Sequence, residues 1–306
     1  MKRKITVSIG IPAHNEENNI VNLLTSIVKQ KGNNFILKKI FVVCDGCTDH
    51  TALLARKFGG NYKKIKVFEG KRRLGKMARL NEIYEMNNCD ILFTFDADVV
   101  LKDDSVIKKI VKIFQNDKSV SLVVAHQIPV LPNNFFGKVV YAANRIWEET
   151  RIPVNKGDHI HNLQGSATAL NKTLTEKIRY PSGLTSDQGY LYMEAKQYGI
   201  FKYAHNAAIL YRPPDNYYDF RLLASRSIYQ DRKTMVDHFG PEVLHEFHIP
   251  FEYKLNAISK MIAQSPVYGI LSILLNIFVR IFHRKDSAVT SKTWEMAQSA
   301  RKAIRL

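Results

Sequence analysis

One stretch decides the fold: Asp90-Ile91-Leu92-Phe93-Thr94-Phe95-Asp96-Ala97-Asp98-Val99-Val100. Its run of Ile, Leu and Phe predicts a buried central strand of an α/β sheet. Ligands bind beyond the carboxyl ends of such strands, where Asp96 and Asp98 stand. Because residues two apart on a strand project to the same side, both carboxylates can reach one cation. They suit Mg²⁺ or Mn²⁺, which take further ligands from substrate phosphates, although a solvated turn would have the same sequence.

Length and charge narrow the class of protein. The chain has 306 residues, enough for an elaborated α/β domain with an appendage. It carries 45 Lys and Arg against 28 Asp and Glu, a net charge of +17, which favours an anionic partner. The sequence contains no arginine-rich arm and no nucleic-acid-binding module. We therefore expect a membrane surface or phosphorylated substrates as partners, and no nucleic acid.

The cysteines and the N-terminus predict the compartment. Cys44, Cys47 and Cys89 make no disulfide framework and fit a reducing environment. The apolar run over residues 5–11 is short and interrupted by Pro12, so it does not resemble a signal peptide. We expect the N-terminal domain to be cytoplasmic.

Three strand-helix cycles precede the opening stretch. Strands are predicted over 5–11, 38–44 and 65–68, the first ending at Pro12, and helices over 20–28, over 51–58 and after residue 76. Polar loops follow each strand. Glu16 either favours a helix N-terminus or contacts a ligand, and Asp45 can accept from a base N–H or a ribose hydroxyl. The glycines and four cations of loop 70–76 can cradle a pyrophosphate, or form a solvated basic loop.

Taken together, these loops resemble the nucleotide-sugar motifs of family-2 glycosyltransferases. The order and spacing match across about the first 100 residues, through Pro12-Ala13-His14-Asn15-Glu16-Glu17, Asp45-Gly46-Cys47-Thr48-Asp49-His50-Thr51, Gly75-Lys76 with Ala78, Leu80 and Asn81, and Asp96-Ala97-Asp98. The resemblance implies the GT-A fold, a Rossmann-like nucleotide-diphospho-sugar transferase fold with a mixed central sheet.

The resemblance also implies roles for individual residues. Pro12, Ala13 and Glu16 would line the nucleoside pocket, and Asp45 would contact the base. Lys76 would lie near the donor phosphates. Asp96 and Asp98 would handle ribose, metal and pyrophosphate, with Mn²⁺ or Mg²⁺ as the cofactor.

The acceptor side is expected in the middle of the chain. Residues 164–170 resemble the family's small-residue strand beneath the acceptor, where Gly165 permits close substrate approach or simple packing. Asp187 matches the catalytic base of the family's acidic motif, although Ser186 replaces the acidic residue that commonly precedes it. A carboxylate there can take the proton of an attacking hydroxyl, or can merely cap the following helix. Arg226 and Arg232 are candidates for diphosphate or acceptor contact in a region that does not match the Gln-x-x-Arg-Trp motif of processive members.

The C-terminal region changes character. We predict a GT-A domain over 1–240, divided into a nucleotide-sugar half (1–100) and an acceptor half (101–240), and a helical membrane-associated region over 241–306. The apolar run 266–279 would span roughly 21 Å as a helix, short of the about 30 Å hydrocarbon core. An interfacial or re-entrant helix on an anionic membrane is favoured, with a helix packed against protein as the alternative.

The sequence thus predicts an inverting glycosyltransferase, peripheral on the inner face of the cell membrane. It would move a sugar from a nucleotide-diphosphate donor, with UDP favoured, to a hydroxyl of a lipid-linked or saccharide acceptor in cell-envelope polysaccharide or glycolipid synthesis. The alternatives are a catalytically silent nucleotide-sugar-binding or membrane scaffold protein, and a nucleotidyltransferase.

Overall fold

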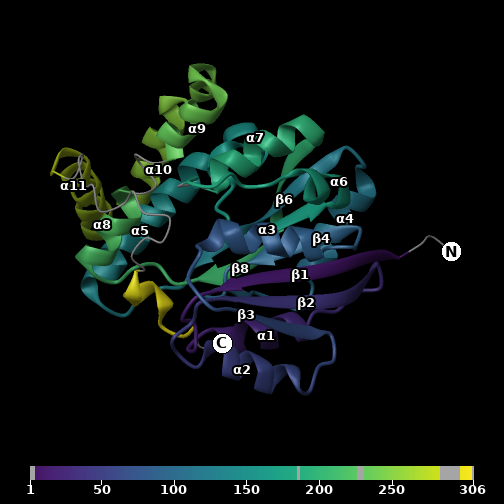
Figure 1. The fold of residues 1–306 in the computed structure, drawn as a ribbon. Helices are drawn as coiled ribbons and strands as arrows, with labels where there is room; N and C mark the ends of the chain where they lie inside the picture. The colour runs from purple at the N-terminus through teal and green to yellow at the C-terminus, as the bar shows by residue number, and fades with distance from the viewer. Residues whose placement is uncertain (1–3, 185–186, 226–230, 283–296, 305–306) are drawn as a thin grey trace.

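The computed structural model describes residues 4–184, 187–225, 231–282 and 297–304. Within them, eight strands form one mixed sheet in the order β3-β2-β1-β4-β7-β6-β8-β5 (Figure 1). The strands are β1 (Ile5–Ala13), β2 (Phe35–Asp45), β3 (Ile65–Gly70), β4 (Ile91–Phe95), β5 (Val100–Leu101), β6 (Val120–Pro129), β7 (Ala167–Asn171) and β8 (Ile200–Tyr211). β3, β2, β1 and β4 are parallel, whereas β7 runs antiparallel to β4 and β6. The predicted mixed α/β sheet is confirmed.

The predicted strand-helix cycles are present, and all three strands extend further than predicted. The helices of this half are α1 (Ile20–Val28), α2 (Thr51–Gly59), α3 (Lys76–Met86) and α4 (Val106–Asn116). The prediction that the first strand stops at Pro12 is wrong, because β1 continues to Ala13 and pairs Pro12 with Val43 of β2. Pairing with β4 ends at Gly10, so β1 has one free side at Pro12, where a residue without an N–H is tolerated.

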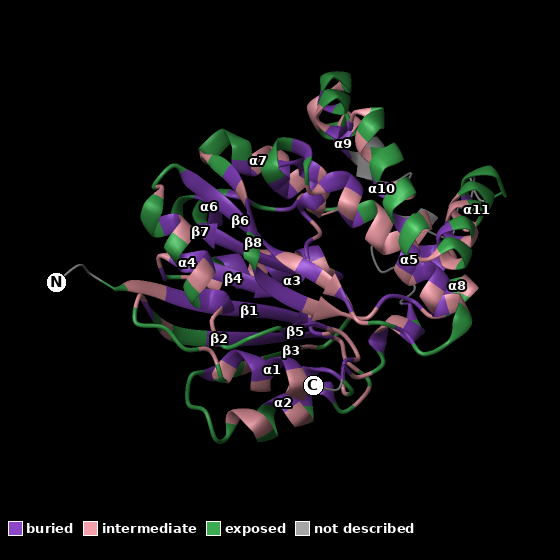
Figure 2. Cartoon of the chain, turned by 180° about the vertical axis from the view of Figure 1, so that it is seen from behind, coloured by how far each residue is buried: buried purple, intermediate pink, exposed green. Residues whose placement is uncertain are grey.

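Two apolar layers cover the sheet because side chains alternate along its strands. Val7, Ile9 and Ile11 of β1 belong to the layer that contains the buried side chains of α1, α2 and α4. Phe41 and Val43 of β2 belong to the opposite layer, beneath α3 and α7. Figure 2 shows the buried strands between these helices. The sheet is therefore rigidly held, and the loops at its carboxyl edge have a fixed frame.

The opening stretch is central, as predicted, but its strand is shorter. β4 lies between β1 and β7, and Ile91 to Phe95 are all buried. The strand ends at Phe95, so Asp96 and Asp98 lie on the turn before β5. We expected the alternation of side chains along a strand to point both carboxylates to one side. That expectation is wrong, because the two residues lie on a turn, and the turn sets the positions of their side chains. The backbone N–H of Asp96 donates to the carbonyl of Ser166 at 3.0 Å, which ties this turn to the segment before β7.

A second group of helices stands beside the carboxyl edge of the parallel strands (Figure 1). This group consists of α5 (Phe135–Arg151), α8 (Tyr217–Ser225), α10 (Phe251–Gln264) and α11 (Pro266–Phe282). The other described helices of the chain are α6 (Lys172–Lys177), α7 (Gln188–Tyr198) and α9 (Asp231–Phe239), with the short 3-10 helices η1 (Val154–Gly157), η2 (Ile160–Asn162), η4 (Pro241–Phe247) and η6 (Gln298–Arg301). Val140, Phe220 and Val279 form the small core that joins α5, α8 and α11. Among the described residues, none of the helices is both long and apolar enough to cross a membrane.

The end of the chain returns to its beginning. Residues 297–304 lie beside the start of α1, and the C-terminal mark in Figure 1 is close to this helix. The side chain of Asn22 donates to the carbonyl of Ile304 at 3.3 Å. Ile304 is buried. The division of the chain at residue 240 stays a prediction, but these last residues contact the nucleotide-sugar half.

Candidate functional site

The loops after β1 and β2 are joined to each other. Asn15 has a φ of 53°, a left-handed conformation that asparagine tolerates, and its side-chain oxygen accepts from the N–H of Thr48 at 2.8 Å. The N–H of Glu16 donates to the Thr51 hydroxyl at 2.6 Å. Pro12, Ala13 and Glu16 are all buried. The loop that carries the predicted nucleoside residues is therefore held by the loop after β2. The predicted contact of Pro12, Ala13 and Glu16 with a nucleoside stays a prediction.

Asp45 is buried at the end of β2, and its carboxylate is bonded within the chain. It accepts from the N–H groups of Leu74 and Gly75 at 2.7 and 2.8 Å, and from Nε of Arg79 at 2.9 Å. Arg79, three residues after Lys76 in α3, also donates to the carbonyl of Arg72 at 2.9 Å. The basic loop 70–76 is thus folded onto Asp45. The predicted contact of Asp45 with a base stays a prediction.

Lys76 is the centre of the site. Its ammonium lies 2.7 Å from Oδ1 of Asp96 and 3.1 Å from Oδ2 of Asp187. It also donates to the carbonyl of Gly165 at 3.4 Å. Burial alone would lower the pKa of Lys76, but the carboxylates of Asp187 and Asp96 outweigh it and raise that pKa. Residues from four different segments of the chain therefore meet at the Lys76 ammonium group, and their predicted roles stay predictions.

Asp187 precedes α7 but does not cap it. It occupies the N-cap position, yet its side chain makes no capping hydrogen bond, and its carboxylate pairs with Lys76 instead. The side chain is largely shielded, with 14% of its surface exposed. A role as helix cap therefore leaves the position of this carboxylate unexplained, whereas a role in the site accounts for it.

Gly165 lies against the two charged groups in a backbone conformation that favours glycine. Its φ is +62°, and a Cβ at this position would be 3.1 Å from Oδ2 of Asp187 and 3.5 Å from Nζ of Lys76. A side chain here would therefore be strained and would press on the ion pair.

Replacing Gly165 by Ala is expected to lower the free energy of unfolding by about 1–2 kcal/mol, because alanine must adopt the left-handed region. Transfer activity should fall by about 10²-fold if Asp187 moves by about 1 Å. Gly60→Ala is the matched control, since Gly60 has a helical φ of −54°. Denaturant unfolding and a transfer assay measure both effects, and an equal response of the two variants would contradict this role of Gly165.

Asp98 fits a cation site. It is half-buried, and loss of water, followed by the charges of Glu16 and Asp96, raises its pKa to about 7. Among the described residues no cation lies within ion-pair distance of it. The same part of the chain contains no group of three His, Cys, Asp or Glu side chains that could hold a metal. Two carboxylates suit a cation that takes its other ligands from water and a diphosphate, so the residues present fit Mg²⁺ or Mn²⁺ bound together with a donor.

Some candidates are not placed, and others were missed. Arg226 lies outside the described residues, and for Arg232 the structure describes only its place in the first turn of α9. Sequence reasoning missed Arg79, whose position on the helix after the basic loop was a usable signal. It also missed Arg301, which forms an ion pair with Glu16 at 2.7 Å and for which no local pattern gave a signal.

Comparison with known sequences identifies the family. Residues 8–179 match the model of the family described as Glycosyl transferase family 2. Two curated relatives are beta-monoglucosyldiacylglycerol synthases, from Nostoc sp. (28% identical over 134 residues) and Trichormus variabilis (27% over 134 residues). Each alignment covers 43% of this chain and 28% of the relative. The chain thus matches less than a third of the length of these relatives.

Solved structures agree with the fold. The mannosyltransferase PcManGT from Pyrobaculum calidifontis, in complex with GDP-Man and Mn²⁺, has a TM-score of 0.62 and 16% identity, over 92% of this chain and 76% of that one. TarS 1–349 of S. aureus with UDP-GlcNAc has a TM-score of 0.55 and 18% identity, over 90% and 88%. Glucosyl-3-phosphoglycerate synthase from Mycobacterium tuberculosis, with Mn²⁺ and UDP, has 0.53 and 19%, over 76% and 79%. These likenesses confirm the GT-A fold. The family model matches more than half of the chain, and the chain therefore belongs to glycosyltransferase family 2.

Proposed function

We propose that this enzyme is an inverting, metal-dependent glycosyltransferase that moves a sugar from a nucleotide-diphosphate donor, with UDP favoured, to a hydroxyl group. The observation that carries the proposal is the position of Lys76 between Asp96 and Asp187. The Lys76 ammonium group thus contacts both Asp96, the expected carboxylate on the donor side, and Asp187, the expected general base. Relatives of similar fold are solved in complex with GDP-Man, UDP-GlcNAc and UDP-Glc, which supports this class of donor.

Asp187 acts as the general base in this proposal. The acceptor oxygen forms a bond to the anomeric carbon while the bond from that carbon to the diphosphate oxygen breaks. The bonding electrons leave with the diphosphate, and the hydroxyl proton goes to the carboxylate of Asp187. A single displacement of this kind inverts the anomeric centre.

Lys76 and the two turn carboxylates serve the leaving group. The ammonium of Lys76 would lie beside the diphosphate and offset its growing charge as the glycosidic bond breaks. Asp96 and Asp98 would hold Mn²⁺ or Mg²⁺, which when bound also offsets the charge of the diphosphate. Since Lys76 already pairs with Asp187, a donor that attracts this ammonium also frees the base for the acceptor.

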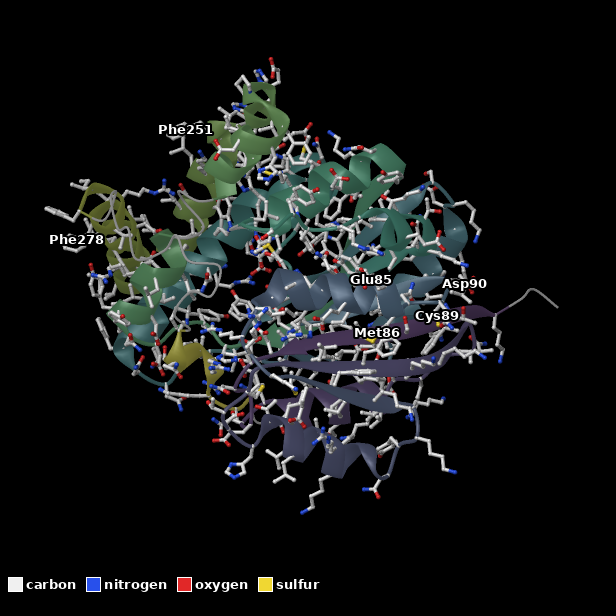
Figure 3. The ribbon with its side chains drawn as sticks, in the orientation of Figure 1. Glu85, Met86, Cys89, Asp90, Phe251 and Phe278 are labelled. Carbon is white, nitrogen blue, oxygen red and sulfur yellow. The ribbon has the colours of Figure 1, made fainter. Side chains whose placement is uncertain are left out.

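The acceptor is proposed to be lipid-linked, or otherwise a saccharide, in envelope polysaccharide or glycolipid synthesis at the inner face of the membrane. α11 packs on the protein through Gly269, Ser272 and Val279, which are its buried residues. Its other faces expose large apolar side chains, among them Leu274 (55%) and Ile281 (63%). Figure 2 shows this exposed surface on α10 and α11, and the labelled Phe251 and Phe278 lie at its outer edge in Figure 3. A helix of this kind suits insertion into one leaflet.

A cavity at the base of α11 supports an amphipathic acceptor. It has a volume of about 490 Å³ and is lined by residues of α5, α10 and α11, among them Lys138, Tyr141, Arg145 and Tyr268. Arg145 is paired with Glu148 and Glu149, so its charge is already offset. Lys138 has no carboxylate within ion-pair distance in the described part of the chain. Its ammonium and the phenol groups beside an apolar surface match an anionic or hydroxylated lipid headgroup. The curated relatives, which are named as glycolipid synthases, point to the same class of acceptor.

Replacing Leu274 and Ile281 together by Glu is expected to weaken binding to vesicles of anionic lipid by about 10²-fold or more. Each side chain would otherwise bury apolar surface worth about 1.5–3 kcal/mol. Co-sedimentation with vesicles measures the loss. The control is Leu53→Glu, since Leu53 is 61% exposed on α2, away from α11 (Figure 1). Equal binding of all three proteins would remove α11 from the membrane role.

The proposed function is tested by incubating the enzyme with UDP-, GDP- and dTDP-sugars, Mn²⁺ and candidate glycolipid acceptors. Release of nucleoside diphosphate that depends on an acceptor is expected, and NMR of the product should show an inverted anomeric centre. Release of a nucleoside monophosphate, or retention of configuration, would contradict the proposal.

A further inference from the structure

The loop after β1 is held by a residue from the opposite end of the chain. Nε of Arg301 donates to Oε1 of Glu16 at 2.7 Å, and its Nη2 donates to the carbonyl oxygens of His14 and Asn15. Both members of the ion pair are buried, with 8% of Arg301 and 5% of Glu16 exposed. The guanidinium thus satisfies a side chain and two backbone groups of a single loop.

Asn19 closes the contact from the other side. Its side-chain amide donates to Oε2 of Glu16 at 3.0 Å and to the carbonyl oxygen of Arg301 at 2.7 Å. Both oxygens of the Glu16 carboxylate are therefore occupied by hydrogen bonds from two different residues. Such a buried, fully bonded pair has one geometry, which is how a charge pair serves specificity and position.

The segment that carries Arg301 is itself anchored. The N–H of Ser299 donates to Oδ2 of Asp219 at 2.7 Å, and Lys302 pairs with Asp215 at 2.6 Å. Arg212 donates to the carbonyl oxygens of Lys302 and Ala303 at 3.1 and 2.9 Å. These anchors come from the loop between β8 and α8 and from the first turn of α8. The segment that contacts Glu16 is therefore held in place by several bonds of its own. Through it, the loop after β1 is connected to α8 and to the loop before α8.

The charge of Glu16 matters for the neighbouring turn. The loop with Glu16 and the turn with Asp96 and Asp98 follow β1 and β4. These are neighbouring parallel strands paired from Val7–Ile91 to Gly10–Thr94, so the loop and the turn leave the sheet side by side. A nucleotide diphosphate is an anion, and an uncompensated carboxylate beside it would repel it. Arg301 supplies the compensating charge without occupying Asp96 or Asp98.

We infer that residues 297–304 contribute to donor binding through Arg301, which is a positioning residue. Arg301 holds the 12–17 loop in place and neutralises the charge of Glu16, so that a nucleotide diphosphate can bind. This inference rests on the proposed function. It means that the donor site is completed only when the end of the chain has folded back. A truncation from about Pro266 would therefore remove donor binding together with α11, so that point variants are needed to separate the two.

The first measurement does not depend on activity. Full-length Arg301→Met is compared with Lys172→Met, because Lys172 is an exposed cation on α6 that has its own carboxylate partner, Glu176, and lies outside the 297–304 segment. Hydrogen exchange at the amides of residues 14–17 should accelerate in Arg301→Met and stay as in the parent in Lys172→Met. Unchanged exchange in Arg301→Met would overturn the inference whatever the enzyme binds.

The second measurement uses donor kinetics. Arg301→Met should raise the KM for the nucleotide sugar by at least about 10-fold while kcat at saturating donor changes little, because a charged partner is lost from binding and not from chemistry. Arg301→Lys, which keeps the charge, should recover part of the affinity, and Lys172→Met should match the parent. Equal KM in Arg301→Met and Lys172→Met would overturn the inference. Failure of the parent itself to bind any nucleotide sugar would overturn only the proposed function, since the exchange result stands alone.

A double variant keeps the test valid if Arg301→Met does not fold. Glu16→Gln combined with Arg301→Met removes both charges, so no unpaired carboxylate remains buried. If Arg301 acts by neutralising Glu16, the double variant should have a lower donor KM than the single Arg301→Met chain, or should fold where that chain does not. A double variant that folds and has the KM of the single variant, or a higher one, would overturn the neutralisation.

Discussion

Replacing Asp187 by Asn is expected to lower sugar transfer by at least about 10²-fold, within the roughly 10²- to 10⁴-fold range of a lost general base. The amide is nearly the same size as the carboxylate, but it cannot accept the acceptor's proton. Lys76 keeps its contact with Asp96, so the site should retain its geometry. Donor affinity should stay within a few-fold of that of the parent. Calorimetry without an acceptor, or with an acceptor analogue that cannot receive the sugar, measures this affinity.

The control for this substitution is Glu194→Gln, the same chemical change on α7, where Glu194 accepts from Gln197 at 3.3 Å. It should leave transfer unchanged. Because the Asp187 side chain makes no capping hydrogen bond, Asp187→Asn should cost less stability than the about 0.5–2 kcal/mol of a lost cap. Near-normal turnover of the variant would remove Asp187 as the base. Asp215 and Asp219 would be poor replacements, since they hold residues 297–304.

Replacing Asp98 by Asn is expected to abolish most of the metal dependence of donor binding. The substitution removes one of the two carboxylates that fit the cation, and loss of a ligand of this kind should weaken metal-assisted donor affinity by about 10²-fold or more. The fold should survive, because the charges of Glu16 and Asp96 oppose that of Asp98 and their repulsion is relieved. Titration with the nucleotide sugar, with and without Mn²⁺, measures the effect.

Asp104→Asn is the matched control for Asp98→Asn. Asp104 lies close in sequence but pairs with Lys31 at 3.1 Å on the surface, where both side chains are more than half exposed. A surface pair of this kind contributes about 0–1 kcal/mol, so donor binding should not change. If Asp98→Asn keeps the Mn²⁺ response of the parent, the cation is held elsewhere.

Local patterns determined much of the fold. The continuous apolar run of β4 and the helical spacing of Ile20, Leu23 and Leu24 predicted buried elements that the structure confirms. A strand buried on both faces selects apolar side chains throughout, and a helix buried on one face selects them at its own repeat. Strand geometry placed Asp96 and Asp98 at the carboxyl edge of the sheet, because ligand-binding groups lie beyond the carboxyl ends of such strands. The resemblance to the family singled out Lys76 and Asp187. The roles of these residues in transfer stay predictions.

The sequence by itself therefore determined which elements form and which polar loops meet at the sheet edge. Only the tertiary structure decided the partners of the charges: Arg79 for Asp45, Lys76 for both Asp96 and Asp187, and Arg301 for Glu16. The Glu16 pair joins residues 285 positions apart. A contact of that range has no period or spacing in the sequence, because it depends on how the sheet, the helices beside it and the returning end of the chain pack in space. Burial then makes the pairing obligatory, since an unpaired charge at either position would be costly to remove from water.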